Sequence, residues 1–121
     1  MGFSRSAHGN SIATLSCSDA AVNAGSVPTY DWPIVQVPET RMPFPRYEKD
    51  NLAAEEQAVE EARRTIQERR DAGKDVAAMI VEPQSSIGMW ASSPAFYKKL
   101  RQLAKTEGIP FIADETKTGM G

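Results

Sequence analysis

The chain has 121 residues, of which 40% are hydrophobic and 25% charged, and its formal net charge is -2 at pH 7. This length fits one domain or part of one, the composition is that of a folded chain, and the charge gives no reason to expect nucleic acid or an anionic membrane as a partner. With one histidine and one cysteine, a four-ligand zinc site made of Cys and His alone cannot be assembled. No apolar run approaches the roughly 20 residues that span a bilayer.

The N-terminal part carries few signals of regular structure. The segment from His8 to Ser11 predicts a turn that leads into a short helix, because Asn and Ser favour helix N-caps. Residues 27–49 are rich in proline, which fixes φ and removes a backbone donor, and we therefore predict an extended surface loop with neither helix nor central strand. The prolines of this loop are Pro28, Pro33, Pro38, Pro43 and Pro45.

A long amphipathic helix is predicted to follow the loop. Asp50 or Asn51 can cap its start, and we expect it to run to about Ala72 and to stop at Gly73. Its acidic residues come early and its basic residues late, which suits the helix dipole. The residues expected on its apolar face recur at helical spacing and are Leu52, Val59, Ala62 and Ile66.

The remaining sequence predicts a strand, a helix and a second strand. Residues 76–81 form a continuous apolar run, as expected for a strand buried on both faces. Ser92 or Ser93 can cap a helix that Gly108 ends, ahead of a strand over residues 109–113. This order is typical of a right-handed βαβ unit in a parallel sheet, so the predicted fold class is α/β. The apolar stripe of the helix is formed by Phe96, Leu100, Leu103 and Ala104.

Acidic residues directly follow both predicted strands. Glu82 comes after the first strand, and Asp114 and Glu115 come after the second. Ligands of open parallel sheets bind beyond the carboxyl ends of the strands. An aspartate at this place could serve Mg²⁺ with phosphate, an activated nucleophile or a cationic ring nitrogen, and the capping of a turn is an alternative of equal weight. The sequence contains no glycine-rich phosphate-binding loop.

Several segments match one family. The segment from Asp114 to Gly121 resembles the D-E-V-Q-T-G-x-G segment of the class III (fold type I) aminotransferases, which use pyridoxal 5'-phosphate (PLP). Val81-Glu82-Pro83 resembles their V-E-P strand end, and the segment from Ala7 to Asn10 resembles their aromatic-H-G-R turn. Tyr30 to Pro33, with the helix start at Lys49 to Asn51, is similar to the 4-aminobutyrate aminotransferases of that family. The resemblance covers almost the whole chain, with the motifs in the right order.

The resemblance implies PLP as the cofactor and places four residues near its ring. Asp114 would hold the protonated pyridine nitrogen, so that the ring can absorb electrons. His8 would lie near the ring or stack on it. Thr116 stands where the family has an apolar residue that packs on the ring, and Lys117 stands where it has a glutamine that hydrogen-bonds the ring's 3-oxygen. Glu82 would have a structural role and satisfy donors at its strand end.

Other positions differ from the family, and parts of its site are absent from the chain. Asn10 replaces an arginine that pairs with a substrate carboxylate, and Ile87 replaces an acidic residue. The family's Schiff-base lysine lies beyond the D-E-V-Q motif, and its phosphate-binding turn lies before the segment present here. We therefore expect residues 1–121 to be an incomplete piece of the large PLP-binding domain, to hold no catalytic residue and not to catalyse transamination alone.

For the complete enzyme, the resemblance implies amino-group transfer from an omega-amino acid such as 4-aminobutyrate to a 2-oxo acid. It also implies a homodimer in the mitochondrial matrix, or otherwise in the cytoplasm. The segment from Met1 to Asn10 lacks the patterns of a secretory signal and of a transit peptide, so no targeting segment is predicted in the chain.

Two other functions are compatible with the sequence. The altered positions favour a non-catalytic aminotransferase-like protein that serves as a binding or dimerisation partner. An unrelated phosphate-binding or regulatory α/β module is disfavoured by the missing glycine-rich loop. Because parallel strands need cover on both faces, we also expect the isolated chain to be marginally stable or aggregation-prone unless it docks onto a partner. A sharp, cooperative melt of a monomer in dilute solution would contradict that expectation.

Overall fold

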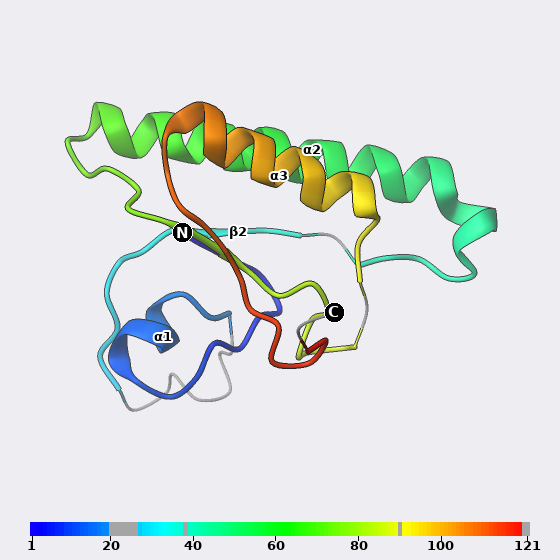
Figure 1. The fold of residues 1–121 in the computed structure, drawn as a ribbon, viewed down its shortest axis with the longest axis horizontal. Helices are drawn as coiled ribbons and strands as arrows, with labels where there is room; N and C mark the ends of the chain where they lie inside the picture. The colour runs from blue at the N-terminus through cyan, green and yellow to red at the C-terminus, as the bar shows by residue number, and fades with distance from the viewer. Residues whose placement is uncertain (20–26, 38, 90, 120–121) are drawn as a thin grey trace.

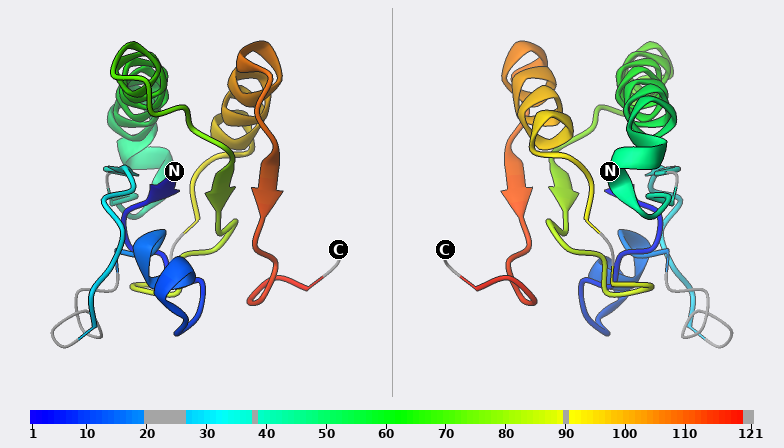
Figure 2. Two further views of the ribbon diagram at one scale, coloured as in Figure 1. Left: turned by 90° about the vertical axis from the view of Figure 1, so that its left-hand side faces the viewer. Right: turned by 90° about the vertical axis from the view of Figure 1, so that its right-hand side faces the viewer.

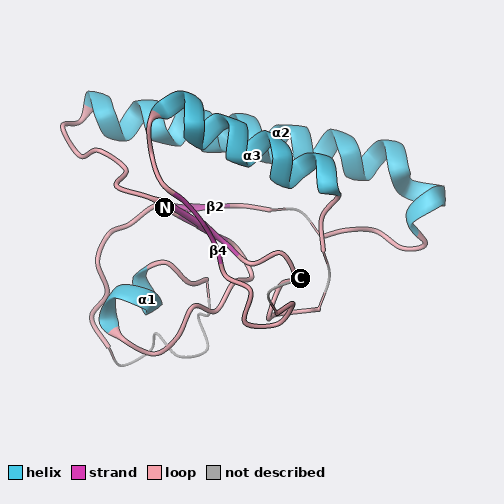
Figure 3. Ribbon diagram, viewed as in Figure 1, coloured by secondary structure: helices cyan, strands magenta, loops and turns pink. Residues whose placement is uncertain are grey.

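A computed structural model describes residues 1–19, 27–37, 39–89 and 91–119 (Figure 1). Helices and strands are distinguished by colour in Figure 3. None of the described helices is long and apolar enough to cross a membrane. The described elements, in chain order, are β1 (Gly2–Phe3), α1 (Ile12–Ser16), β2 (Ile34–Val35), α2 (Phe44–Asp71), β3 (Met79–Val81), α3 (Pro94–Glu107) and β4 (Phe111–Ala113).

The strands are short and all their pairings are parallel. β1 pairs with β2, and β3 pairs with β4, where Ile80 lies opposite Ile112. Two backbone hydrogen bonds connect the two pairs: the Met1 ammonium donates to the Ala78 carbonyl over 2.9 Å, and the Ile80 N–H donates to the Met1 carbonyl over 3.1 Å. The strands therefore lie in the order β2-β1-β3-β4, and α3 connects the parallel strands β3 and β4. This arrangement confirms the predicted α/β class.

The two long helices lie side by side on one side of the strands (Figures 1 and 2). On the opposite side the sheet is partly open, since Ile80 of β3 is only half-buried and its partner in β4, Ile112, is 45% exposed. The prediction that residues 76–81 form a strand buried on both faces is therefore wrong for the described residues, and the strand itself is limited to Met79–Val81. The largest fully buried side chains belong to Phe3, Phe96, Ile66, Met79, Leu100 and Val35.

Helix α3 agrees with its prediction. The Ser93 side chain is the N-cap and accepts a hydrogen bond of 3.2 Å from the Phe96 N–H, and Pro94 occupies the first turn. Gly108 ends the helix in a left-handed conformation with φ of 71°, which glycine adopts without steric cost. The predicted apolar stripe is buried and consists of Phe96, Leu100, Leu103 and Ala104.

Helix α2 begins earlier than predicted. It starts at Phe44, so the predicted caps Asp50 and Asn51 lie inside it, and the predicted loop 27–49 ends six residues early. Pro45 lies in the first turn of α2. A proline there costs no hydrogen bond, because the first N–H groups of a helix have no partner within it. The Asn51 side chain instead joins the helix to the preceding loop, since it accepts from the Arg41 N–H over 2.9 Å and donates to the Arg41 carbonyl over 3.0 Å.

The buried face of α2 differs at one predicted position. Leu52 is 40% exposed, whereas Glu55 is 6% exposed and faces α3. The carboxylate of Glu55 accepts hydrogen bonds from the N–H and the hydroxyl of Ser93, which satisfies a polar group that would otherwise be costly to bury. Within the proline-rich loop, the strand β2 is extended as expected, but it pairs with β1, which the sequence did not predict.

Candidate functional site

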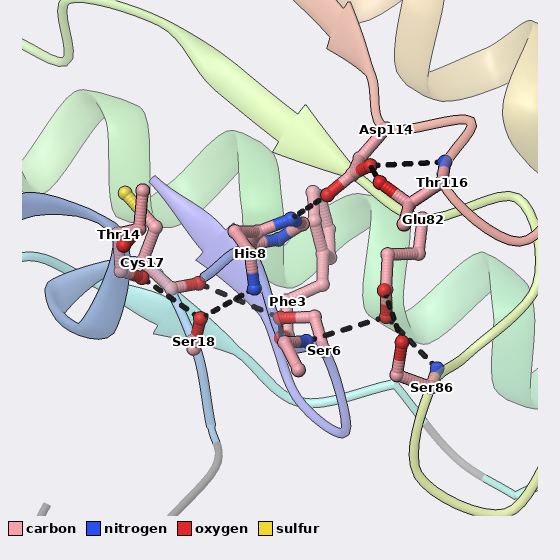
Figure 4. Close-up of polar contacts among 11 residues, drawn as sticks. Phe3, Ser6, His8, Thr14, Cys17, Ser18, Glu82, Ser86, Asp114 and Thr116 are labelled. Atoms are coloured by element: carbon pink, nitrogen blue, oxygen red, sulfur yellow. Dashed lines mark hydrogen bonds and ion pairs between the residues drawn. The ribbon is translucent and has the colours of Figure 1, made fainter. Parts of the chain in front are cut away.

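The candidate site lies beyond the carboxyl ends of β1, β3 and β4. Because these strands are parallel, the loops that follow them emerge at the same edge of the sheet. The loop after β1 carries His8, the residue after β3 is Glu82, and the residue after β4 is Asp114. Figure 4 shows these side chains and their polar contacts. The structure thus gathers residues that lie as many as 106 positions apart in the sequence.

His8 and Asp114 are in direct contact. The Nδ1 atom of His8 lies 2.8 Å from Oδ2 of Asp114, and the side chains are 1% and 17% exposed, respectively. The His8 backbone N–H donates to the Ser18 hydroxyl over 2.8 Å, which fixes the turn that presents the ring. Helix α1 follows this turn with Ser11 as its N-cap, as predicted from the sequence. The position of His8 is thus determined by both its backbone and its side chain.

Asp114 is held as an anion by hydrogen bonds. Its Oδ1 atom accepts from the Thr116 N–H over 3.1 Å and from the Thr116 hydroxyl. Partial burial raises the pKa of Asp114, but the hydrogen bonds from Thr116 and His8 lower it by more, so the pKa lies below its usual value. Because the carboxylate can only accept, the proton shared with His8 belongs to Nδ1 of the ring. The other ring nitrogen, Nε2, is buried and has no hydrogen-bond partner among the described residues.

Glu82 connects two of the loops. It is 6% exposed, and its Oε2 atom accepts from the Ala7 N–H over 3.3 Å and from the Ser86 N–H over 2.9 Å. The Ser86 hydroxyl donates to the Oε1 atom over 2.5 Å. These bonds confirm the predicted structural role of Glu82 as an acceptor for loop donors. They fix the loop after β1, which carries His8, against the loop after β3.

The segment after Asp114 is a folded, exposed turn. The N–H groups of Thr118 and Gly119 donate to the Glu115 carbonyl over 3.1 and 2.7 Å. Four residues were predicted to lie near a cofactor ring, and two of them, His8 and Thr116, contact a third, Asp114. The Lys117 side chain is exposed on the same turn.

The positions that depart from the family pattern lie at the surface. Asn10 is exposed at the bend before α1, and Ile87 is 38% exposed in the loop after β3. Two residues of the site, Ser18 and Ser86, were not singled out from the sequence. The Ser18 hydroxyl accepts from the His8 N–H, and the Ser86 hydroxyl and N–H donate to Glu82. A lone serine in a polar segment gives no signal of such contacts.

Comparisons with known proteins agree with this arrangement. The family described as aminotransferase class-III matches residues 1–121. The 4-aminobutyrate aminotransferase of Emericella nidulans is 36% identical over all of this chain and 24% of its own length, and the mitochondrial 4-aminobutyrate aminotransferase of Homo sapiens is 34% identical over all of this chain and 25% of its own length. The chain therefore spans about a quarter of the length of these relatives.

Solved structures give the same result for the fold. A lysine aminotransferase from M. tuberculosis superposes with a TM-score of 0.81 at 27% identity, over 99% of this chain and 27% of its own. An amine transaminase from an uncultivated Pseudomonas species in its PLP-bound form superposes with a TM-score of 0.79 at 22% identity, over 99% of this chain and 28% of its own. The fold is that of the fold type I PLP aminotransferases, and the chain belongs to the class-III aminotransferase family.

Proposed function

We propose that this chain supplies the ring-nitrogen side of the PLP site in an aminotransferase that moves an amino group from an omega-amino acid, such as 4-aminobutyrate, to a 2-oxo acid. The observation that carries the proposal is the Asp114 carboxylate, held beyond the end of β4 by His8 and Thr116. The family match and the relatives named 4-aminobutyrate aminotransferase support the reaction class and the substrate.

The residues present fit a cationic ring nitrogen. An ionised carboxylate offers about four acceptor positions, two on each oxygen. Thr116 donates twice to Oδ1 of Asp114 and His8 donates once to Oδ2, so that Oδ2 keeps one acceptor position. The side chain is 17% exposed, and its pKa is below the usual value, so it carries a full negative charge at neutral pH. A charged N–H donor would form a short, charge-assisted hydrogen bond with such an oxygen.

Each residue of the site has a separate task in this proposal. When bound and protonated on its ring nitrogen, PLP supplies a sink for the electrons released at the substrate carbon. Asp114 keeps the proton on that nitrogen. His8 holds the carboxylate in place, and Glu82 holds the loop that carries His8. Thr116 and Lys117, on the turn after Asp114, are proposed to lie beside the ring.

The remaining parts of the proposal concern the whole enzyme. The chain spans about a quarter of the length of its relatives, and we propose that these 121 residues bind the cofactor ring but do not complete transamination by themselves. By the same likeness we infer a homodimer and a location in the mitochondrial matrix. Sedimentation of the whole enzyme tests the first inference, and fractionation of cells that produce it tests the second.

The test of the binding site is equilibrium dialysis of the chain against PLP and against 1-deaza-PLP, in which carbon replaces the ring nitrogen. We expect saturable PLP binding near one equivalent, weakened roughly 10- to 100-fold by Asp114→Asn, because the variant keeps the shape and loses the charge. The analogue should bind wild type and variant equally, since it presents no ring N–H. Asp50→Asn, on the exposed side of α2, is the matched control and should bind both ligands as wild type does.

The outcomes separate the competing functions. If Asp114→Asn weakened the binding of PLP and of 1-deaza-PLP equally, the carboxylate would stabilise the fold and would not contact the ring nitrogen. Weak, non-saturating binding by the wild type would contradict the proposed site and favour a non-catalytic binding or dimerisation partner. Turnover of 4-aminobutyrate with a 2-oxo acid by the 121 residues would contradict the proposal that they are inactive alone.

A further inference from the structure

The two oxygens of Asp114 have different partners. Oδ1 accepts both donors of Thr116, the backbone N–H at 3.1 Å and the hydroxyl, whereas Oδ2 accepts from His8 at 2.8 Å. The bond from an aspartate oxygen to the N–H two residues later is an Asx-turn, which many aspartates form for structural reasons alone. The additional hydroxyl bond is not needed for that turn, and it comes from a residue that is itself exposed.

The second bond to Oδ1 has a consequence for any ligand. Each carboxylate oxygen accepts about two hydrogen bonds, so Oδ1 of Asp114 is filled by Thr116 alone. A further donor can then bind only to Oδ2, whose direction is set by the buried His8 ring. If residue 116 lacked a hydroxyl, both oxygens would have an open acceptor position, and a ligand could bind the carboxylate in two ways.

We propose that Thr116 is a positioning residue: its hydroxyl occupies Oδ1 and leaves Oδ2 of Asp114, oriented by His8, as the single acceptor for a cationic ring nitrogen. The part of this proposal that concerns the ligand rests on the proposed function, and the part that concerns Oδ1 does not. Thr116 acts on the ligand through Asp114, in addition to any contact of its own with the ring. The hydroxyl also stabilises the charged form of the carboxylate.

The variants Thr116→Val and Thr116→Ser separate the hydroxyl from the backbone. Valine keeps the backbone N–H, the branched shape and the Asx-turn, and it removes only the hydroxyl. Serine keeps the hydroxyl and removes a methyl group. Because residue 116 is exposed, neither change removes packing from the core, and both variants should fold as the wild type does.

The first arm needs no cofactor. The carboxyl carbon of Asp114 is followed by ¹³C NMR through an acid titration of the chain, with amide spectra of the three proteins as the test of folding. We expect Thr116→Val to move the midpoint to higher pH and Thr116→Ser to match the wild type. The same midpoint in Thr116→Val and wild type, with both folded, would overturn the proposal, because a purely structural Asx-turn predicts that result.

The second arm measures PLP binding by equilibrium dialysis. Thr116→Val opens a second acceptor position on Asp114 and should tighten PLP binding by about twofold, and Thr116→Ser should leave it unchanged. With 1-deaza-PLP the two variants should bind alike. Equal PLP affinities of Thr116→Val and Thr116→Ser would overturn the hydroxyl's role toward the ligand. If the Asp114 midpoints shift as expected but the chain binds no PLP, the hydrogen bond from Thr116 to Oδ1 would stand and the proposed function would be overturned.

Discussion

The contact between Glu55 and Ser93 is expected to be a costly polar interaction to remove from the described part of the chain. Both residues are buried, and the Glu55 carboxylate accepts from the Ser93 N–H over 2.6 Å and from its hydroxyl over 2.5 Å. The same hydroxyl oxygen accepts from the Phe96 N–H as the N-cap of α3. Ser93→Ala therefore removes two hydrogen bonds with one atom and weakens the link between α2 and α3.

The expected magnitude follows from these two roles. Loss of a serine N-cap costs about 1 kcal/mol. Loss of one of the two donors to a buried carboxylate costs about 1.5 to 3 kcal/mol, which brings the total for Ser93→Ala to about 2.5 to 4 kcal/mol. Glycine retains most of the preference for the N-cap position, so Ser93→Gly should cost about 1 kcal/mol less than Ser93→Ala. Losses of this size are a large part of the roughly 5 to 15 kcal/mol that stabilises a typical domain.

The assay is urea unfolding followed by circular dichroism at low temperature, for wild type, Ser93→Ala, Ser93→Gly, Glu55→Gln and the double variant Glu55→Gln/Ser93→Ala. The double variant should be less destabilised than the sum of its single changes, because both remove the same contact. A Ser93→Ala midpoint within the error of the wild type would refute the reasoning. Strict additivity of the two single changes would refute the coupling between the residues and leave only the N-cap.

Two further predictions concern the site and its support. Gly2→Ala would place a Cβ atom 2.0 Å from the Cys17 carbonyl oxygen, so the backbone must shift. Gly73→Ala meets no neighbouring atom and only places alanine at a positive φ, which costs about 1 to 2 kcal/mol. Thermal unfolding should therefore show a larger loss of stability for Gly2→Ala than for Gly73→Ala. The pKa of Asp114 is lower in the folded state than in the unfolded state, so its contribution to stability is complete above the unfolded value and is lost as the pH falls through the folded value. Urea midpoints should therefore fall less between about pH 5 and pH 3 in Asp114→Asn than in wild type, and parallel profiles would contradict this.

The elements that the sequence predicted well are those with local signals. Helix α3 has a serine cap, a proline in its first turn and a glycine at its end, and each of these acts within one turn of the helix. Strand β1 has no such signal, because two residues are too few to show a periodicity. It forms only through hydrogen bonds between this part of the chain and its neighbours β2 and β3. The early start of α2 was missed for a related reason. The prolines of residues 27–49 predict an extended loop, but Pro45 lies where a proline can begin a helix.

The site was predictable from the sequence to different extents. Glu82 and Asp114 could be placed together because both directly follow strands of one parallel sheet. His8 could not be placed by spacing, since it lies in a turn after a strand that the sequence did not reveal, and only the family resemblance associated it with Asp114. The structure adds the direct contact between them. It also shows that Oδ1 of Asp114 caps a turn, as one of the alternatives weighed from the sequence expects, while Oδ2 faces His8.

The difference between local sequence signals and distant contacts also explains why one face of the sheet is partly exposed. The apolar run of residues 76–81 is suited to burial on both faces, because residues on each face of a strand alternate and both sets are apolar here. Among the described residues, α2 and α3 cover one face, and on the other face Ile80 is half-buried and its partner in β4, Ile112, is exposed. The sequence of this strand therefore specifies more burial than the described part of the chain provides. A partner surface that covered Ile112 would meet that requirement and would leave the strand ends, where His8 and Asp114 meet, unchanged.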